Sequence, residues 1–204
     1  MKLSVKFGVA EKESTDVIII SLFENGGKIP SELSALNKAS GGAISSLLQN
    51  KDFTGKLNET VLVPTDKKIV PKRILLVGLG KTTEFSLDKV RQATGTATRV
   101  IQRKKYKNPS ILLYKMETKG IPLEDVTRSV VEGILLSLYN FTMYKTLKKE
   151  EITAITNYSL VVQKKDVLEN IKSIVKKTQI VAEAVCFTRD LVNMSGSDAT
   201  PTFL

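Results

Sequence analysis

Short apolar runs alternate along the chain with longer segments of helical period, and this alternation is the strongest constraint on the fold. The runs are rich in β-branched residues and have the length of strands; they occupy residues 3–9, 16–23, 59–63, 73–77, 110–114 and 158–162. Segments with an apolar residue at every third or fourth position occupy residues 30–50, 86–106, 122–141 and 166–193. Parallel strands need such crossover helices, so the pattern predicts an α/β fold with a mixed, mostly parallel sheet flanked by helices on both faces.

Local signals refine the helical segments. Gly41 and Gly42 interrupt the first one and predict two short helices or one kinked helix. Ser86 is placed to cap the second segment, with Asp88 in its first turn. Pro122 stands at the expected first helical position of the third.

Composition changes only after Asn193, where small, polar and helix-breaking residues replace the helical pattern. This change predicts a boundary after Asn193. Pro201 is typical of a residue that starts a helix. We therefore expect more protein to follow residue 204.

The stretch VGLGKTTEF at residues 77–85 follows an apolar strand and raises the question of a phosphate-binding loop. A P-loop needs its first glycine five residues before Gly80, where this chain has Leu75. The dinucleotide fingerprint needs a third glycine where Thr83 stands. Both motifs fail on spacing, so we interpret the stretch as a glycine turn at the end of a strand.

The 204-residue chain contains no histidine and a single cysteine, Cys186. This composition excludes catalysis by a Ser-His-Asp or Cys-His group and zinc sites built on histidine and cysteine. The adjacent carboxylates Glu124–Asp125 and Glu150–Glu151 are interpreted as surface charges. Cys186 is expected to be a small packing residue, because no histidine is present to activate it.

The formal net charge of +10 is compatible with an acidic partner such as nucleic acid. The densest basic cluster holds Arg99, Arg103, Lys104, Lys105 and Lys107. A second, more dilute group holds Lys145, Lys148, Lys149, Lys164, Lys165, Lys172, Lys176 and Lys177. Such charge runs more commonly reflect solvated helix ends than a docking surface. No signal peptide and no apolar run of about 20 residues is present, which predicts a cytoplasmic protein without a membrane partner.

Four stretches together resemble the N-terminal portion of the leucyl (cytosol) aminopeptidases, the M17 metallopeptidase family. They are SGGAISSLLQNKDFTGK at residues 40–56, VGLG at 77–80, VEGILLSLYNFTMYK at 131–145 and TRDLVNMSGSDATPTFL at 188–204. The third and fourth carry most of the resemblance, which covers nearly the whole chain. The family typically continues Glu-Pro-Ala-Asn where this chain has Met194 to Ser197, a departure that leaves the course of the linker open.

The resemblance implies a two-domain metallo-exopeptidase that releases N-terminal amino acids from peptides. Its N-terminal domain, here residues 1–165, would be macro-domain-like and non-catalytic. The helix at 166–193 would link it to a catalytic domain that begins near residues 194–204. That second domain would hold two divalent metals, zinc or manganese, through aspartates, a glutamate and a lysine, and a metal-bridging water would attack the peptide carbonyl with bicarbonate as base. The resemblance therefore places no catalytic, metal-binding or cofactor-binding residue in this chain.

The resemblance also implies the partners: the chain's own catalytic domain and further copies in a homo-hexamer, in which the N-terminal domain would have an architectural role. Two alternatives remain open at this point. One is a basic module that binds nucleic acid, and the other is a macro-like domain that binds a nucleotide or ADP-ribose. Tyr139, Phe141 and Tyr144 are interpreted as packing residues, and Arg189 and Asp190 as anchors of the linker helix without named partners.

Overall fold

A six-stranded sheet forms the centre of the computed structural model, which describes residues 1–24, 29, 33–65, 69–113, 120–145, 155–200 and 202. The strand order is β1-β6-β5-β2-β4-β3. Every neighbouring pair is parallel except β3 and β4, which are antiparallel. The prediction of a mixed, mostly parallel α/β sheet is therefore confirmed.

Each strand expected from the sequence is present, and most of the bounds agree within about two residues. They are β1 (Lys2–Phe7), β2 (Val17–Leu22), β3 (Thr60–Pro64), β4 (Arg73–Gly78), β5 (Pro109–Leu112) and β6 (Asn157–Val162). Strand β2 is the most hydrophobic of them, and all six of its residues are buried. A strand that is covered on both faces needs such a continuous apolar run. The expected last residue of β5, Tyr114, lies outside the described residues.

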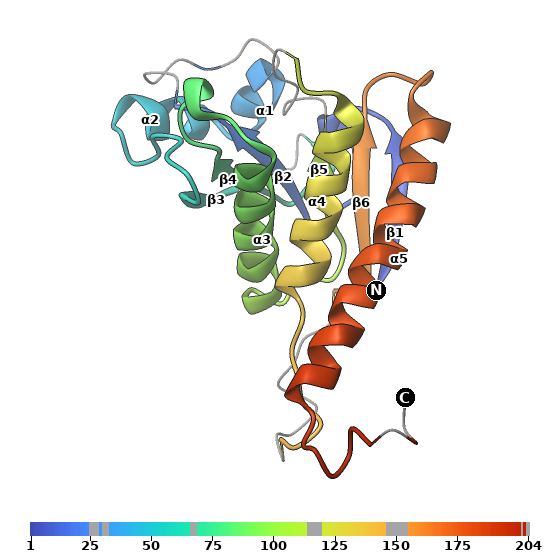
Figure 1. Ribbon diagram of the computed structural model, residues 1–204. Coiled ribbons are helices and arrows are strands. Elements are labelled where there is room, and N and C mark those ends of the chain that lie inside the picture. Colours follow the sequence, from blue (N-terminus) through green and yellow to red (C-terminus); the bar gives the residue numbers. More distant parts are fainter. Residues whose placement is uncertain are drawn as a thin grey trace.

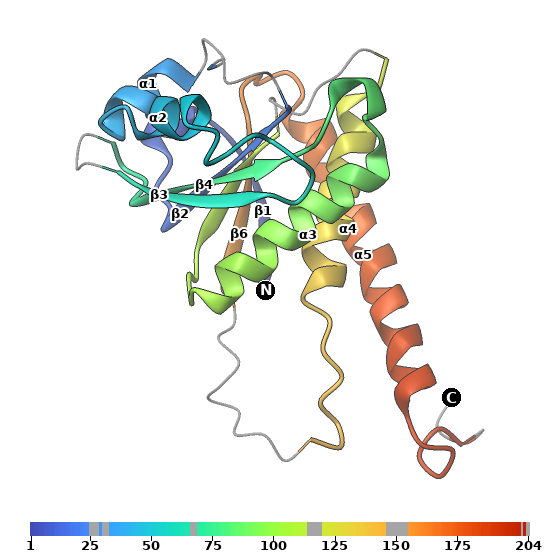
Figure 2. The same cartoon turned by 90° about the vertical axis from the view of Figure 1, so that its left-hand side faces the viewer.

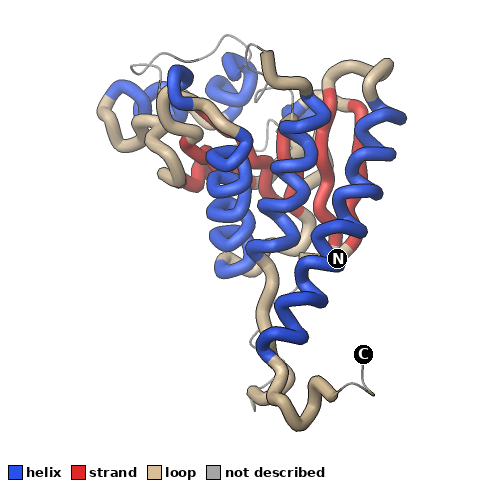
Figure 3. The backbone as a smooth tube through the Cα atoms, viewed as in Figure 1, coloured by secondary structure: helices blue, strands red, loops and turns tan. Residues whose placement is uncertain are grey.

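Three long helices cover one face of the sheet, and Figure 1 shows them side by side in front of it. They are α3 (Leu87–Arg103), α4 (Leu123–Ser137) and α5 (Leu168–Asn193). Their apolar sides bury Val90, Ile134 and Ile171 against residues of the strands, including Ile19 and Leu160. Figure 3 shows this arrangement as a layer of helices over a layer of strands.

The second face carries two short helices, α1 (Ser34–Ala39) and α2 (Ala43–Gln49), and the 3-10 turn η1 (Ala10–Lys12). Figure 2 shows α1 and α2 on the opposite side of the sheet from α3, α4 and α5. They pack on the half of the sheet formed by β2, β4 and β3, where Ile18 and Leu76 join the second apolar cluster. Helices on both faces were expected; the helical cover of this second face is short.

The break between α1 and α2 falls where the two glycines predicted it. Gly42 adopts a φ of +84°, a left-handed conformation that side-chain-bearing residues rarely adopt. The side chain of Asn37 then caps α2, because its Oδ1 accepts a hydrogen bond from the backbone N–H of Ser45 at 2.9 Å. The expected helix start near Pro30 lies outside the described residues.

Helix α3 starts as expected, since the Ser86 hydroxyl oxygen accepts a hydrogen bond from the N–H of Lys89 at 3.3 Å. Pro122 is the N-cap of α4, one residue before the helix, and so is not its first helical residue. The larger correction concerns the end of α4. The helical pattern was expected to continue to Phe141, but α4 ends at Ser137 and the chain turns away toward the end of α5.

Helix α5 begins at Leu168 and runs to Asn193, close to the expected 166–193. Its first half lies over β1 and α4, whereas its second half extends past the edge of the sheet (Figure 1). No helix in the described part of the chain is both long and apolar enough to span a membrane.

Candidate functional site

The glycine turn after β4 is a place where two backbone segments cross. A Cβ atom on Gly78 would lie 1.8 Å from the carbonyl oxygen of Lys56, so only glycine fits. The N–H of Leu79 donates to the carbonyl of Leu22 at 2.8 Å, and the N–H of Gly80 donates to the carbonyl of Gly55 at 2.9 Å. Both amide groups are therefore already used within the chain. The turn fixes β4 against residues 55–56 and does not offer these two amides to a phosphate.

A cluster of backbone N–H groups beside this turn is also filled by the chain itself. The Glu59 carboxylate accepts hydrogen bonds from the N–H groups of Thr54 and Gly55, each at 2.9 Å, and from that of Lys56 at 3.1 Å. The Thr54 hydroxyl donates to the same oxygen at 2.9 Å. Such a concave group of amides is an anion-binding element, and Glu59 is its anion.

The acidic side chains do not gather into a metal site in the part of the chain that the structure describes. Glu124 accepts a hydrogen bond from the Asn170 amide at 2.8 Å, and Asp125 pairs with Arg128 at 2.7 Å. Both are surface interactions, as expected for this adjacent pair. The pair Glu150–Glu151 lies outside the described residues.

Cys186 is a half-buried thiol on α5. Burial raises the pKa of the Cys186 thiol, and this outweighs the opposite effect of the nearby Arg189 guanidinium. A raised pKa lowers the fraction of thiolate, which is the nucleophilic form. The environment of Cys186 is thus that of a packing residue.

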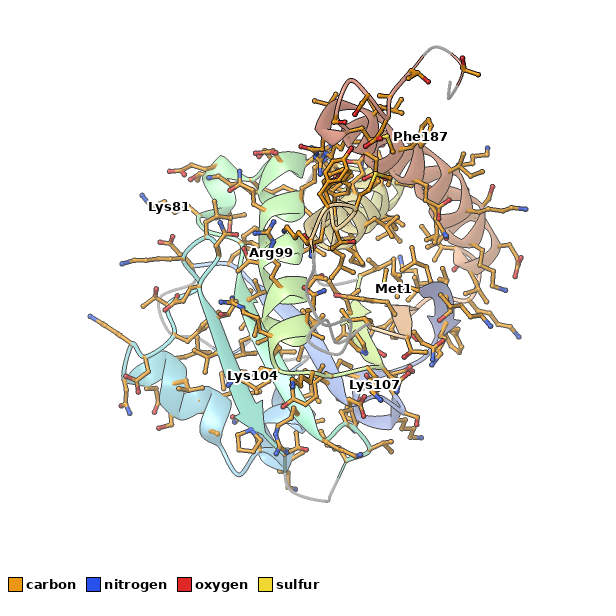
Figure 4. The ribbon with its side chains drawn as sticks, turned by 90° about the horizontal axis from the view of Figure 1, so that it is seen from below. Met1, Lys81, Arg99, Lys104, Lys107 and Phe187 are labelled. Atoms are coloured by element: carbon orange, nitrogen blue, oxygen red, sulfur yellow. The ribbon has the colours of Figure 1, made fainter. Side chains whose placement is uncertain are left out.

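The densest basic cluster lies at the carboxyl end of α3, and Figure 4 marks Arg99, Lys104 and Lys107 there. Its five members are exposed, and none of them pairs with an acidic side chain within the described residues. Lys105 has a φ of +63° and closes the helix through a 3.0 Å bond from its N–H to the carbonyl of Gln102. Positive charge at a helix carboxyl end is favourable, so the cluster stabilises α3 and still leaves charge available to an anion.

The second basic group does not form one surface. Lys164 and Lys165 precede α5, whereas Lys145 lies in the segment that contacts the other end of that helix. Lys148 and Lys149 lie outside the described residues. Its remaining members, Lys172, Lys176 and Lys177, are exposed along the first half of α5.

The most specific polar arrangement joins the segment after α4 to the end of α5. The Tyr139 hydroxyl donates to Asp190 Oδ1 at 2.9 Å and accepts from the Asn193 amide at 3.1 Å, while the Arg189 guanidinium lies 5.5 Å from the centre of the Tyr139 ring. Burial of the Tyr139 hydroxyl raises its pKa, and the Asp190 carboxylate adds to this effect. Tyr139 thus supplies the partner for Arg189 and Asp190 that the sequence did not reveal.

Tyr144 makes the second half of this arrangement. Its hydroxyl accepts a hydrogen bond from the N–H of Ser195 at 2.8 Å and contacts the carboxylate of Asp198. Its ring packs edge-on against Phe141, with centroids 5.5 Å apart. We call the contacts of Tyr139 and Tyr144 with residues 189–198 the clasp. The clasp holds the segment after α4 beside the carboxyl end of α5.

The second half of α5 exposes large apolar side chains. Val192 is 80% exposed, and Ile180, Val181 and Phe187 are each more than half exposed; Val185 is exposed to a smaller extent. Val181, Val185 and Val192 recur at helical spacing near the buried side of α5, while Ile180 and Phe187 lie seven residues apart on the other side. A helix that is apolar on more than one side is typical of a position surrounded by protein.

Segments 131–145 and 188–204, which carry most of the family resemblance, thus meet in space at the clasp. The sequence model of the N-terminal domain of the cytosol aminopeptidase family matches residues 19–148. The chain belongs to the cytosol aminopeptidase family. The matched region runs from β2 through all of α4 and includes the tyrosines of the clasp.

Curated family members extend the match over more of the chain. A probable cytosol aminopeptidase of Geotalea uraniireducens is 32% identical over 169 residues, which are 83% of this chain and 34% of that protein. A probable cytosol aminopeptidase of Geobacter sp. (strain M21) is 29% identical over 205 residues, covering 100% of this chain and 40% of that protein. The chain therefore spans about a third to two fifths of the length of these relatives.

Solved structures support the same fold. A mutant leucine aminopeptidase of tomato aligns with a TM-score of 0.81 at 19% identity, covering 100% of this chain and 40% of that one. A bottromycin maturation enzyme in complex with Mn gives 0.67 at 20% identity, over 93% of this chain and 34% of that one. A macrodomain of Trypanosoma brucei in complex with ADP gives 0.63 at 12% identity, over 85% of this chain and 69% of that one. The expected macro-domain-like fold is confirmed.

Sequence reasoning missed the clasp because it interpreted Tyr139, Phe141 and Tyr144 as packing residues. The available signal was the pairing of two family-like segments, 131–145 and 188–204, that lie far apart in the sequence. Tyr139, Tyr144 and Asp190 supply polar groups that a simple packing helix would not need.

Proposed function

We propose that this chain works as the non-catalytic N-terminal domain of a leucyl aminopeptidase, and that the peptidase chemistry belongs to a C-terminal domain. The observation that carries the proposal is the match to the N-terminal domain of the cytosol aminopeptidase family, in a chain that spans 34% to 40% of two such relatives. The substrates of the whole enzyme would be peptides, from which it releases N-terminal amino acids in the cytoplasm.

The metals of the proposed enzyme would be two divalent ions, zinc or manganese, held by the C-terminal domain. The bottromycin maturation enzyme, which shares the fold, was solved with Mn. The described part of this chain offers no group of three acidic or thiol ligands. The proposal places the metal ligands in the C-terminal domain, as the family resemblance implies.

The role proposed for the chain is architectural, with residues 1–165 as the folded domain, 166–193 as the helix between domains and 194–204 as the entry to the next domain. The exposed apolar side chains on the second half of α5 support this division, because they are where a following domain would pack. The clasp supports it as well, since it holds the end of α5 in a defined direction. A homo-hexamer of the whole enzyme is part of the same proposal.

The test compares hydrolysis of leucyl p-nitroanilide, with Mn²⁺ present, by this chain and by the product of its reading frame up to the stop codon. We expect activity in the longer product and none in the 204-residue chain. Activity of the short chain that follows the protein through a second chromatography step would contradict the proposal. So would an inactive longer product that is folded and binds Mn²⁺.

Binding to nucleic acid is a second candidate function, supported by the exposed basic cluster at the end of α3, which pairs with no acidic side chain among the residues that the structure describes. Phosphate contacts predict an affinity for duplex DNA that falls steeply as salt rises. Replacement of Lys104 and Lys107 by glutamate should then abolish binding at low salt, while the same change at Lys176 and Lys177 on α5 should have a smaller effect. Binding that is absent at low salt, or insensitive to salt, would exclude this function.

Nucleotide or ADP-ribose binding rests on the fold alone. The macrodomain that was solved with ADP shares 12% identity with this chain, and such a likeness does not transfer a ligand. The amides of the glycine turn are used by Leu22 and Gly55, which gives this function no support at that turn. Calorimetry with ADP-ribose at millimolar concentration would test it, and measurable binding would revive it.

A further inference from the structure

The second face of the sheet carries a row of hydroxyl groups at the amino ends of β1, β6 and β5, next to the buried apolar residues Leu112 and Val161 of the same face. Ser4, Ser159 and Ser110 stand at the same register on the three neighbouring strands. The equivalent row continues on β2 with Ile18, which is fully buried under α1 and α2. A sheet face that is simply to be covered gains more from apolar residues, so the change to hydroxyls at three neighbouring positions calls for a polar neighbour.

A hollow of about 610 Å³ lies over this serine row. Its walls are formed by the segments before β2 and before β4, and by the first residues of β1 and β6. The lining residues include Lys2, Lys6, Asp16, Lys72, Asn108 and Asn157, together with Ser4 and Ser159. Ser159 is almost fully buried at its base, with 6% exposure. The volume is in the range of pockets for small molecules.

The charges in the hollow leave an excess of positive groups. Glu13 is occupied, since it pairs with Lys6 at 2.7 Å and accepts from the Ser110 hydroxyl at 3.2 Å. Asp16 is held by the backbone N–H groups of Lys107 and Asn108, at 3.3 and 3.0 Å, and is 4.0 Å from the Lys72 ammonium. The ammonium of Lys2 pairs with no acidic side chain among the described residues.

The neutral groups of the hollow can both donate and accept hydrogen bonds. The hydroxyls of Ser4 and Ser159 are 3.1 Å apart and share one hydrogen bond, which leaves a hydrogen and lone pairs for a ligand. The Asn157 amide donates to Asn108 Oδ1 at 2.9 Å, and its own oxygen remains an acceptor. Hydroxyl groups of a ligand match such a surface, because they also donate and accept.

We propose that this hollow binds a small phosphorylated polyol, of the size of a sugar phosphate. The ammonium groups of Lys2 and Lys72 contact the phosphate, and Ser4, Ser159 and Asn157 contact the polyol hydroxyls. The hollow lies at the amino ends of the parallel strands, opposite the carboxyl-end crevice where α/β folds usually bind ligands. It is therefore separate from that crevice, and it goes beyond the proposed function as an N-terminal domain.

The test follows backbone amide signals of the ¹⁵N-labelled chain by NMR during titration with ribose 5-phosphate at constant ionic strength. Ribose alone and inorganic phosphate alone serve as ligand controls. We expect saturable shifts centred on Ser4, Asn108 and Ser159, with an affinity for ribose 5-phosphate at least about tenfold above that for inorganic phosphate.

Variants test whether the hollow is a specific binding site or only a region of positive charge. Lys72→Ala removes an exposed ammonium and Ser159→Val replaces the central hydroxyl by a residue suited to a strand, and each should lower the affinity by about tenfold. Lys177→Ala, on the exposed side of α5, should leave it unchanged. The proposal is overturned if no saturable shift appears, if phosphate binds as well as ribose 5-phosphate, or if Lys177→Ala weakens binding as much as Lys72→Ala. None of these outcomes bears on peptide hydrolysis, so failure here leaves the proposed function intact.

Discussion

The two halves of α5 both carry apolar residues but have opposite surroundings. The first half buries Ile171, Ile174 and Val175 against the sheet and α4. The second half exposes Val181, Phe187 and Val192 to solvent at its far end. One helix thus contains a segment whose apolar residues are covered within this chain and a segment whose apolar residues are not. The difference teaches that a helical pattern in the sequence specifies an apolar surface, and that the rest of the fold decides what covers it.

The clasp adds to this comparison because it lies at the uncovered end. Hydrogen bonds from Tyr139 and Tyr144 hold α5 where apolar packing is sparse. Hydrogen bonds fix the orientation of the helix end, whereas burial of apolar surface supplies most of the free energy of folding. We therefore expect substitutions in the two halves to differ more in their effect on stability than their side-chain chemistry alone would suggest.

The largest expected effect is that of Ile171→Ala in the covered half. Ile171 is fully buried, so its truncation leaves a cavity and should lower the free energy of unfolding by about 2–5 kcal/mol. The matched change Val192→Ala, in the exposed half, should alter it by no more than about 0.5 kcal/mol. Urea denaturation followed by circular dichroism measures both. If both variants lost the same free energy of unfolding, the two halves of α5 would not differ in how far their apolar residues are buried.

The second largest expected effect is a decrease in the free energy of unfolding at alkaline pH. Tyr158 lies fully buried beneath the helical layer, and burial raises its pKa far above the usual value of 10.0. The unfolded chain loses this proton near pH 10 while the folded chain keeps it. The stability is therefore intact below about pH 10 and falls by about 1.4 kcal/mol for each further pH unit, until the folded-state pKa is reached.

Tyr158→Phe is the control for this pH effect, because it removes the ionisable group. Its stability should fall less steeply than that of the unmodified chain between pH 10 and 11, as measured by urea midpoints. Its cost at neutral pH should be small, since only the hydrogen bond between Tyr158 and Thr98 is lost. Parallel pH profiles for the two proteins would show that Tyr158 is not the group responsible.

Tyr139→Phe should have a smaller and local effect at the clasp. The ring and its contact with Arg189 remain, but the hydrogen bonds to Asp190 and Asn193 are lost. Amide hydrogen exchange should then become faster in residues 186–193, while exchange in residues 168–178 stays unchanged. Faster exchange along the whole helix would mean that the two halves unfold as one unit.

The smallest expected effect on stability is that of replacing Val181, Val185 and Phe187 together by serine. These side chains are already exposed, so the free energy of unfolding should change little. Self-association and binding of a hydrophobic dye should fall, because the exposed apolar surface is reduced. Sedimentation velocity and dye fluorescence measure this. A large loss of stability would show that these residues are covered within the isolated chain.

Most of the fold could be predicted from local patterns, because strand and helix periods depend on neighbouring residues. The break at Gly42 and the cap at Ser86 were predicted from single residues with known conformational preferences. The prediction for α4 was wrong beyond Ser137, since Leu138 and Phe141 continue the helical spacing while the chain turns to reach α5. A local sequence pattern contains no information about the contacts that these residues make with a distant segment.

The glycine turn and the serine row were harder to predict than the fold, because each is formed by segments that lie far apart in the sequence. The failed phosphate motifs at Gly78 and Gly80 could be recognised from spacing alone, but the reason for the glycines could not. Gly78 is needed because the carbonyl of Lys56 passes at a distance that no Cβ allows. In the same way, Ser4, Ser110 and Ser159 look unrelated in the sequence, and only strand pairing places them in one row.

By itself, the sequence determined the α/β class, the strands, most helix bounds and the likeness to the cytosol aminopeptidases. These properties follow from backbone preferences and apolar periodicity, which act over a few residues at a time. The tertiary structure alone decided the strand order, the antiparallel pairing of β3, the clasp, and which half of α5 is covered. Those features come from contacts between segments that are distant in the sequence, and their free energy depends on the packing of the whole chain.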